Sequence, residues 1–289
     1  MNHLGTVVAA HGRQYRIATD EGQTWLCFPR GKKSILVCGD EVLFEPTNSE
    51  LGVISTLLPR RSLFYRSDAW KQRLIAANVT QVVIVVATEP AFSTPLITRC
   101  LIAAEAQDIA TLIVLNKCDL SASLRASAVA ALSPFASLGY RVIELSARND
   151  SSPLRPHLAG HTNLLIGQSG MGKSTLTNGL LPQARAATRE ISLSLNTGKH
   201  TTTQATLYRL HADCALIDSP GLTEFGLRHL SRDQIEHGFI ELRPLLGQCR
   251  FRDCRHDREP DCRLRLALQS GEIDARRFAE YRLLCAESG

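Results

Sequence analysis

The sequence predicts a multidomain protein with an N-terminal β-barrel, a central α/β domain and an α-helical, metal-binding C-terminal domain. Short β-like segments separated by turns fill about the first sixty residues. Buried β-like segments then alternate with helical ones, and three cysteines and a histidine crowd into residues 249–262. We expect the three domains to span residues 1–62, 63–228 and 229–289.

Length and composition are those of an ordinary soluble globular protein. The 289 residues are 44% hydrophobic and 21% charged. The longest apolar run, residues 82–87, is too short to cross a bilayer, and the N-terminus lacks a basic segment followed by an apolar one. We therefore expect a cytoplasmic, monomeric protein without membrane contact and with reduced thiols. The net charge of +5 permits a nucleic-acid partner without requiring one.

The N-terminal segment has the pattern of a small closed barrel. Five strands in so short a span favour an OB-fold or its SH3-like relative. Basic and aromatic residues alternate near the first loops, a mixture that suits RNA because cations meet phosphates and rings stack on bases. Alternatively, Trp25 and Phe28 fill the interior of the barrel. The expected strands are 5–9, 14–18, 24–28, 41–44 and 52–56, and the residues concerned are Arg13, Tyr15, Arg16, Trp25, Phe28, Arg30, Lys32 and Lys33.

From residue 78 the pattern changes to alternating strands and helices. Near-continuous apolar runs of strand length belong to a parallel sheet covered by helices on both faces. The expected strands are 79–88, 109–115 and 140–145, and the helices between them are 94–107 and 121–138.

A phosphate-binding loop follows. Residues 167–174 fit the pattern G-x-x-x-x-G-K-[ST] between an apolar run at 164–166 and a helical one at 173–181. Glycines let successive backbone N–H groups point at one anion, and the helix N-terminus adds partial positive charge. We expect Lys173 to reach the β- and γ-phosphates and Ser174 to bind Mg²⁺. The predicted loop residues are Gly167, Gln168, Ser169, Gly170, Met171, Gly172, Lys173, Ser174 and Thr175.

The strand at 109–115 ends in a base-recognition pattern, N-K-x-D. Asp119 can accept hydrogen bonds from the N1–H and the exocyclic amine of guanine, whereas adenine offers neither donor there. Asn116 can bond the base edge and brace the phosphate loop, and Lys117 can cover the ring face. The pattern therefore favours GTP and GDP. The predicted base-binding residues are Asn116, Lys117, Cys118, Asp119, and the small-residue pair Ser146 and Ala147.

Two further segments predict contacts with the γ-phosphate and its magnesium ion. A threonine of residues 196–203 can complete the Mg²⁺ shell; Thr202 is the candidate, with Thr201 and Thr203 as alternatives. Residues 218–221 have the form D-x-x-G, in which Asp218 can hold a Mg²⁺-bound water and the Gly221 N–H can contact the γ-phosphate.

The order of these motifs is unusual. In an ordinary GTPase the phosphate loop comes first, whereas here N-K-x-D and the 146–147 pair precede it. The chain is therefore circularly permuted, which a compact domain tolerates because its termini usually lie close together.

The water-orienting residue is also atypical. Many GTPases place a glutamine after D-x-x-G, but Leu222 stands there and has no polar group. His200 is our candidate, since a neutral imidazole can accept a hydrogen bond from water. Alternatively, His200 contacts only its own loop or a partner.

The C-terminal cysteine cluster predicts a structural metal. Three thiols and an imidazole spaced C-x4-C-x-H-x5-C supply four ligands for one closed zinc site. Arginines crowd the same loop and could contact phosphates, or could pair with neighbouring acids. Helices are expected at 264–269 and 273–285. The predicted ligands are Cys249, Cys254, His256 and Cys262.

With the permuted motifs and this knuckle, the chain closely resembles the bacterial small-ribosomal-subunit-dependent GTPases, the RsgA family. The resemblance covers essentially the whole chain. It implies an OB-fold, a permuted GTPase domain and a zinc-binding tail. It also implies hydrolysis of GTP that the small ribosomal subunit stimulates, contact with its ribosomal RNA, and a role late in subunit maturation. The chain departs from the family pattern in having Asp261 where glycine is common, and in an N-terminus that begins almost at the first strand.

Two other functions fit parts of the sequence. One is an RNA-binding assembly scaffold whose nucleotide only stabilises the fold. The other is an ATP-dependent enzyme that shares only the phosphate loop, a reading that Asp119 argues against.

Overall fold

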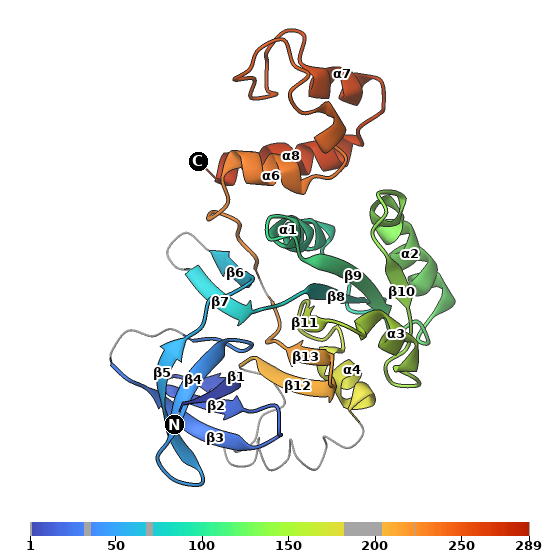
Figure 1. The fold of residues 1–289 in the computed structure, drawn as a ribbon. Coiled ribbons are helices and arrows are strands. Elements are labelled where there is room, and N and C mark those ends of the chain that lie inside the picture. The colour runs from blue at the N-terminus through green and yellow to red at the C-terminus, as the bar shows by residue number, and fades with distance from the viewer. Residues whose placement is uncertain (1, 32–35, 68–71, 182–203, 223, 289) are drawn as a thin grey trace. The chain divides into compact units, whose positions relative to one another are not determined.

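The computed structural model describes residues 2–31, 36–67, 72–181, 204–222 and 224–288 (Figure 1). The chain divides into two compact units, which are described separately. The first unit comprises Met1–Tyr65, Arg73–Ser93 and Ile109–Glu224, and the second comprises Arg66–Gln72, Thr94–Asp108 and Phe225–Gly289.

A five-stranded barrel opens the first unit, as the sequence predicts. Alternate residues of each strand are buried and partly exposed, the pattern of a barrel wall. The strands are joined in the order β1-β2-β3-β5-β4, β4 closes back onto β1, and β3 runs parallel to β5, which is the arrangement of an OB-fold. They are β1 (His3–His11), β2 (Gln14–Ala18), β3 (Thr24–Pro29), β4 (Glu41–Pro46) and β5 (Leu51–Leu57).

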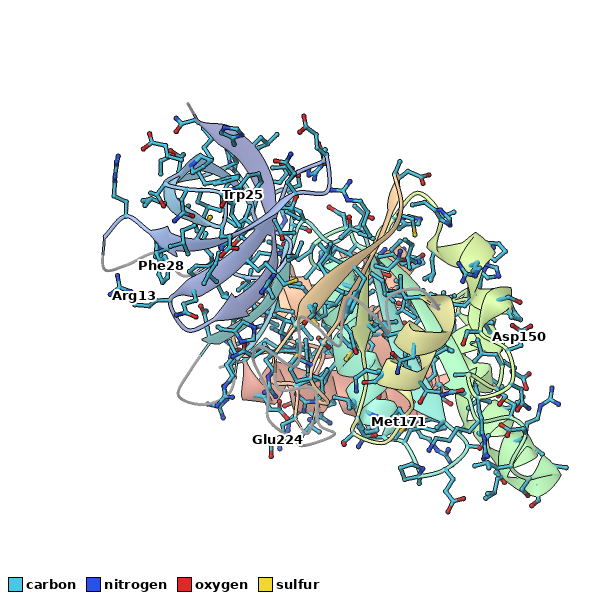
Figure 2. The ribbon with its side chains drawn as sticks, turned by 90° about the horizontal axis from the view of Figure 1, so that it is seen from below. Arg13, Trp25, Phe28, Asp150, Met171 and Glu224 are labelled. Atoms are coloured by element: carbon cyan, nitrogen blue, oxygen red, sulfur yellow. The ribbon has the colours of Figure 1, made fainter. Side chains whose placement is uncertain are left out.

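The barrel core separates the aromatic residues into two groups. Tyr15 and Trp25 are buried with Phe44 in the interior, where the Trp25 and Phe44 ring centroids lie 5.2 Å apart. Phe28 remains 39% exposed on the outer surface. The prediction that these rings fill the interior of the barrel is therefore correct for Trp25 and wrong for Phe28 (Figure 2).

The same sheet continues from the barrel into the α/β region. The parallel order is β10-β9-β8-β11-β13, and β12 adds antiparallel to β13 and pairs with β1 at Ala9 and Thr206. The parallel strands and hairpin confirm the predicted α/β domain. The strands are β8 (Gln81–Ala87), β9 (Ala110–Asn116), β10 (Val142–Glu144), β11 (Thr162–Ile166), β12 (Thr206–His211) and β13 (Cys214–Asp218).

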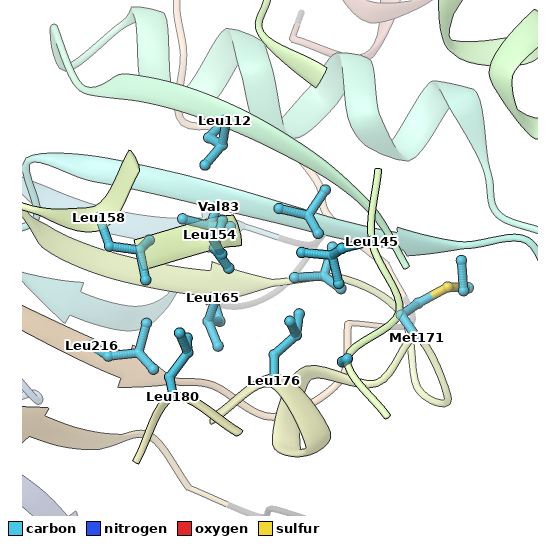
Figure 3. Close-up of a cluster of buried hydrophobic side chains, with 14 of the residues drawn as sticks. Val83, Leu112, Leu145, Leu154, Leu158, Leu165, Met171, Leu176, Leu180 and Leu216 are labelled. Carbon is cyan, nitrogen blue, oxygen red and sulfur yellow. The ribbon is translucent and has the colours of Figure 1, made fainter. Parts of the chain in front are cut away.

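One face of this sheet is covered by helices of the first unit. Alternate sheet residues such as Val83, Leu165 and Leu216 pack with Leu158 and Leu176 in one buried cluster (Figure 3). The cluster therefore positions the start of the helix that follows the phosphate loop. The helices of this unit are α2 (Ala122–Ser137), η1 (Ser152–Leu154), α3 (Arg155–Leu158) and α4 (Lys173–Leu180).

A buried ion pair lies where the barrel chain enters the α/β region. The Arg60 guanidinium donates to both oxygens of Asp40 at 2.6 and 2.8 Å, and Asp40 is fully buried. Asn78 donates to the Gly39 carbonyl at 2.9 Å. Gly39 itself has a positive φ, and a Cβ there would lie 2.1 Å from the Ala77 carbonyl oxygen. These contacts fix the barrel against the sheet within the first unit.

The second unit gathers helices from two distant parts of the sequence. Helix α1 (Thr94–Glu105) belongs to it, with α6 (Arg232–Gly238), η2 (Arg243–Leu245), α7 (Arg263–Gln269) and α8 (Ala275–Glu287). Two further strands, β6 (Leu63–Ser67) and β7 (Gln72–Ala77), pair as a separate two-stranded sheet, and most of their residues belong to the first unit. Among the described helices, none is both long and apolar enough to span a membrane.

Arg277 links α1 to the rest of the second unit. Its guanidinium donates to Thr98 Oγ1 at 2.8 Å and to Glu241 Oε1 at 2.7 Å, and it lies 4.6 Å from the centroid of the Phe239 ring. Arg277 is only 6% exposed. Because a buried charge without partners is costly, this network holds α1 firmly against the C-terminal helices.

Candidate nucleotide site and metal cluster

The phosphate loop leaves the carboxyl end of β11 and enters α4, the strand–loop–helix setting expected for it. Lys173 is 7% exposed, and its ammonium donates to the carbonyls of Gly167 and Gln168 at 2.9 and 3.1 Å. Burial lowers the pKa of Lys173. The lysine thus folds over its own loop, at the place where an anion bound by the loop would neutralise its charge.

Asn116 joins three of the predicted segments. Its amide nitrogen donates to the Met171 carbonyl of the phosphate loop at 2.9 Å, and its oxygen accepts from the Ala147 N–H at 2.8 Å. The same oxygen accepts from the Lys117 N–H, and Asn116 is 2% exposed. One buried side chain therefore ties the base-recognition segment, the phosphate loop and the 146–147 pair together, despite their permuted order.

Gly172 shows how closely these segments approach. Its φ is +92°, in the left-handed region that favours glycine. A Cβ at this position would lie 2.2 Å from the Asn116 amide nitrogen. The second glycine of the loop pattern is thus required both by its backbone conformation and by the base-recognition asparagine beside it.

Asp119 lies exposed at the same edge, beyond the end of β9. The Ser146 hydroxyl is the main cause that lowers the pKa of Asp119, and the charge of Arg148 acts in the same direction. The carboxylate is therefore ionised at neutral pH and can act as a hydrogen-bond acceptor. Lys117 has a positive φ, and its ammonium donates to the Glu89 carbonyl at 2.8 Å.

Asp218 and Ser174 offer oxygen atoms that fit a magnesium ion. Ser174 Oγ lies 3.4 Å from Asp218 Oδ2, and Asp218 Oδ1 is buried without a hydrogen-bond partner in the described residues. Burial raises the pKa of Asp218 to about 6, against the opposing charge of Lys173. Mg²⁺ prefers oxygen ligands, and a bound ion would give the buried Asp218 Oδ1 a partner. Ser174 and Asp218 therefore fit the ion.

The D-x-x-G segment lies against the phosphate loop. The Leu222 N–H donates to the Gly167 carbonyl at 3.0 Å, and a Cβ on Gly221 would lie 3.1 Å from Ser169 Cα. Leu222 is 4% exposed. The residue that stands where other GTPases have glutamine is therefore buried and apolar.

Several predicted residues lie outside the described residues. These are His200, Thr201, Thr202 and Thr203, together with Lys32 and Lys33 of the barrel.

Residues 88–93 also lie at this edge, although no motif in the sequence marks them. Gln168 Oε1 accepts the Ser93 N–H at 3.0 Å, and Pro90 lies 3.6 Å from where a Cβ on Gly170 would be. The available signal was their position directly after β8, because the carboxyl ends of neighbouring parallel strands meet at one edge.

The four predicted metal ligands form one cluster in the second unit. His256 Nδ1 lies 3.4, 3.5 and 3.3 Å from the sulfurs of Cys249, Cys254 and Cys262, and the Cys249 and Cys262 sulfurs are 3.9 Å apart. A tetrahedral zinc site has edges of about 3.6 Å between nitrogen and sulfur and about 3.8 Å between sulfurs. The four groups therefore fit a zinc ion.

The backbone and charges of this loop explain two features of its sequence. Asp261 has a φ of +56°, in the region where glycine is at ease and aspartate is tolerated, which accounts for the departure from the family pattern. Arg250 pairs with Asp261 and Arg263 with Glu272, at 3.0 and 2.7 Å. Part of the arginine charge is thus neutralised locally, as one of the two interpretations predicts.

Comparison with solved structures places the whole chain in one structural class. The crystal structure of YjeQ from Thermotoga maritima matches with a TM-score of 0.74 and 28% identity, covering 100% of this chain and 99% of that one. YloQ, described as a circularly permuted GTPase, shares the fold with a TM-score of 0.72 at 24% identity, over 100% of this chain and 95% of that one. The fold and the site define a circularly permuted GTPase.

The family follows from sequence. A model of the RsgA GTPase family matches residues 57–228. A relative from Nitrosomonas europaea named small ribosomal subunit biogenesis GTPase RsgA is 50% identical over 97% of this chain and 90% of its own length. A relative of the same name from Burkholderia pseudomallei is 51% identical over 98% of this chain and 92% of its own. The chain belongs to the RsgA GTPase family.

Proposed function

We propose that this protein binds GTP where the base-recognition segment meets the phosphate loop, and hydrolyses it in a cycle coupled to late maturation of the small ribosomal subunit. The main support for the nucleotide site is that the Asn116 side chain connects the segments that would form it. A buried amide that holds the Met171 carbonyl and the Ala147 N–H sets both halves of a nucleotide site at fixed spacing. The partner follows from relatives named for biogenesis of that subunit.

Each part of the site has a chemical task in this proposal. The phosphate loop, from Gly167 to Thr175, surrounds the phosphates with backbone N–H groups, and Lys173 exchanges its two carbonyl contacts for phosphate oxygens. Asp119 reads the guanine edge, with Ser146 and Ala147 closing over the base. Ser174 and Thr202 would supply oxygen ligands to a magnesium ion, and Asp218 would hold a water of that ion. Magnesium, when bound, neutralises charge that develops on the phosphates.

A zinc ion held by Cys249, Cys254, His256 and Cys262 would have a structural task. Four protein ligands would leave no position for a catalytic water, so the ion would stabilise the loop between η2 and α7. We propose that the chain has three domains, which span residues 1–62, 63–228 and 229–289. We also propose that the protein acts as a monomer in the cytoplasm.

The barrel offers one surface for ribosomal RNA. Arg13 donates to the Gly31 carbonyl at 2.7 Å, which places its side chain beside the loop that follows the exposed Phe28 (Figure 2). An exposed ring that precedes this loop and a guanidinium that contacts it suit base stacking and phosphate contact.

The decisive experiment measures hydrolysis of GTP and ATP with increasing amounts of small ribosomal subunits. We expect GTP turnover to rise at least about tenfold and ATP turnover to remain at background, since ATP cannot satisfy Asp119. GTP binding without subunit-dependent turnover would favour a scaffold function. Turnover of ATP at the rate of GTP would favour an ATP-dependent enzyme.

His200 is proposed to orient the attacking water, because the buried Leu222 cannot. We expect His200→Ala to keep nucleotide affinity within about twofold and to lower subunit-stimulated turnover at least about 100-fold, the lower end of the range for loss of a residue that handles a proton or water. Affinity is measured with a fluorescent GTP analogue, and turnover by phosphate release. His237→Ala, a change on α6 in the second unit, is the control. Unchanged stimulated turnover in His200→Ala would reject the role.

A further inference from the structure

The histidine of the metal cluster has a carboxylate on its far side. His256 presents Nδ1 to the three cysteine sulfurs, while its other nitrogen, Nε2, lies 3.7 Å from Glu236 Oε1. His256 is 5% exposed and the Glu236 side chain 12%. The two groups therefore face one another in a largely buried part of the second unit.

Glu236 is itself held in place by two donors. The Tyr281 hydroxyl donates to Glu236 Oε1 at 2.6 Å, and Arg232 Nε donates to the same oxygen at 3.0 Å. Tyr281 is fully buried on α8, and Arg232 and Glu236 lie four residues apart on one face of α6. The carboxylate thus has a fixed position, with a positive charge beside it that offsets the cost of burying its own charge.

Arg232 makes a second contact with the metal loop. Its guanidinium donates to the backbone carbonyl of Arg255, the residue before His256, and also to the Tyr281 hydroxyl at 3.1 Å. The α6 helix therefore holds two successive residues of the loop, one through the backbone and one through the imidazole.

The tautomer of His256 explains why a carboxylate on its far side is needed. An imidazole that binds a metal through Nδ1 keeps its proton on Nε2, and a buried N–H without an acceptor is costly. Metal-binding histidines usually donate this proton to a carboxylate, carbonyl or water that fixes the ring and raises its basicity. We infer that Glu236, oriented by Arg232 and Tyr281, is the acceptor that positions His256 for zinc. This inference rests on the proposed zinc site.

The test compares zinc affinities of the full-length protein, measured by competition with a chromophoric chelator. We expect Glu236→Ala to bind zinc about 10- to 100-fold more weakly than the unmodified chain, the range for loss of such a partner. Glu236→Gln keeps an oxygen acceptor and is expected to lose less. Glu287→Gln is the matched control, because Glu287 lies in the same unit and pairs with Arg99 at 2.6 Å. This substitution should leave the affinity within about twofold.

A second readout separates positioning from general stability. Cobalt(II) in place of zinc reports the ligand geometry through its visible absorption bands. We expect the cobalt bands to shift in Glu236→Ala and to stay unchanged in Glu287→Gln. Unchanged affinity in Glu236→Ala, or weakened affinity with unshifted cobalt bands, would overturn the inference. If the unmodified protein binds no zinc, the proposed zinc site fails first and the inference with it.

Discussion

Asp119→Asn is expected to change the base preference of the protein from guanine to xanthine. The ionised carboxylate of Asp119 offers only acceptors, which match the N1–H and the exocyclic amine of guanine. Asparagine offers one acceptor and one donor. Xanthine has a carbonyl in place of the amine, so the asparagine amide can pair with it where the carboxylate cannot.

The expected size of the effect follows from the hydrogen bond lost. Asparagine still accepts from the N1–H, but the exocyclic amine loses its charged acceptor, a bond that contributes about 1.5–3 kcal/mol, so GTP affinity should fall roughly one to two orders of magnitude. Affinity for xanthosine triphosphate should rise by a similar factor. Dissociation constants for GTP, xanthosine triphosphate and ATP measured on both proteins give the comparison.

Asp213→Asn is the matched control for this substitution. Asp213 lies in the turn between β12 and β13 of the same unit and is exposed, so the change in charge is the same while the base-recognition segment is untouched. Its preference should remain with guanine. If Asp119→Asn binds GTP as tightly as the unmodified chain, Asp119 does not read the base.

Local patterns in the sequence predict much of the fold. Alternating burial in the barrel strands is visible in the sequence because each strand has one face in the core, as the paired burial of Tyr15 and Ile17 on β2 illustrates. Strands β8 and β9 are buried on both faces, so their sequences are nearly continuous hydrophobic segments. The predicted nucleotide residues meet because parallel strands bring their carboxyl ends to one edge.

Long-range partners could not be predicted in the same way. The helical spacing of residues 94–107 correctly predicts α1, but its hydrogen-bond partner Arg277 lies 179 residues away from Thr98. Periodicity reports which face of a helix is apolar, and does not identify what covers it. The same holds for β12, whose pairing with β1 depends on a barrel nearly two hundred residues earlier in the chain.

Asn116→Ala is expected to weaken nucleotide binding strongly while leaving the unit folded. The change removes the Met171, Ala147 and Lys117 contacts at a site that is 2% exposed. Three backbone groups then lose their partner, at a cost of about 1–3 kcal/mol each where they stay dry. Because these bonds set the spacing between the base-reading and phosphate-binding segments, we expect GTP affinity to fall at least about 100-fold, measured by titration with a fluorescent analogue.

Asn163→Ala separates this effect from a loss of stability. Asn163 is also a fully buried asparagine, and it donates to the Leu158 and Ala215 carbonyls at 2.9 and 3.0 Å and accepts from Gln81 at 2.8 Å. It lies near the start of β11, at the edge opposite the phosphate loop. Both variants should lower the denaturant midpoint by comparable amounts. The hydrogen-bond networks of Asn116 and Asn163 are of similar size, but only that of Asn116 reaches the phosphate loop. If both variants lose GTP affinity equally, Asn116 therefore acts only through stability.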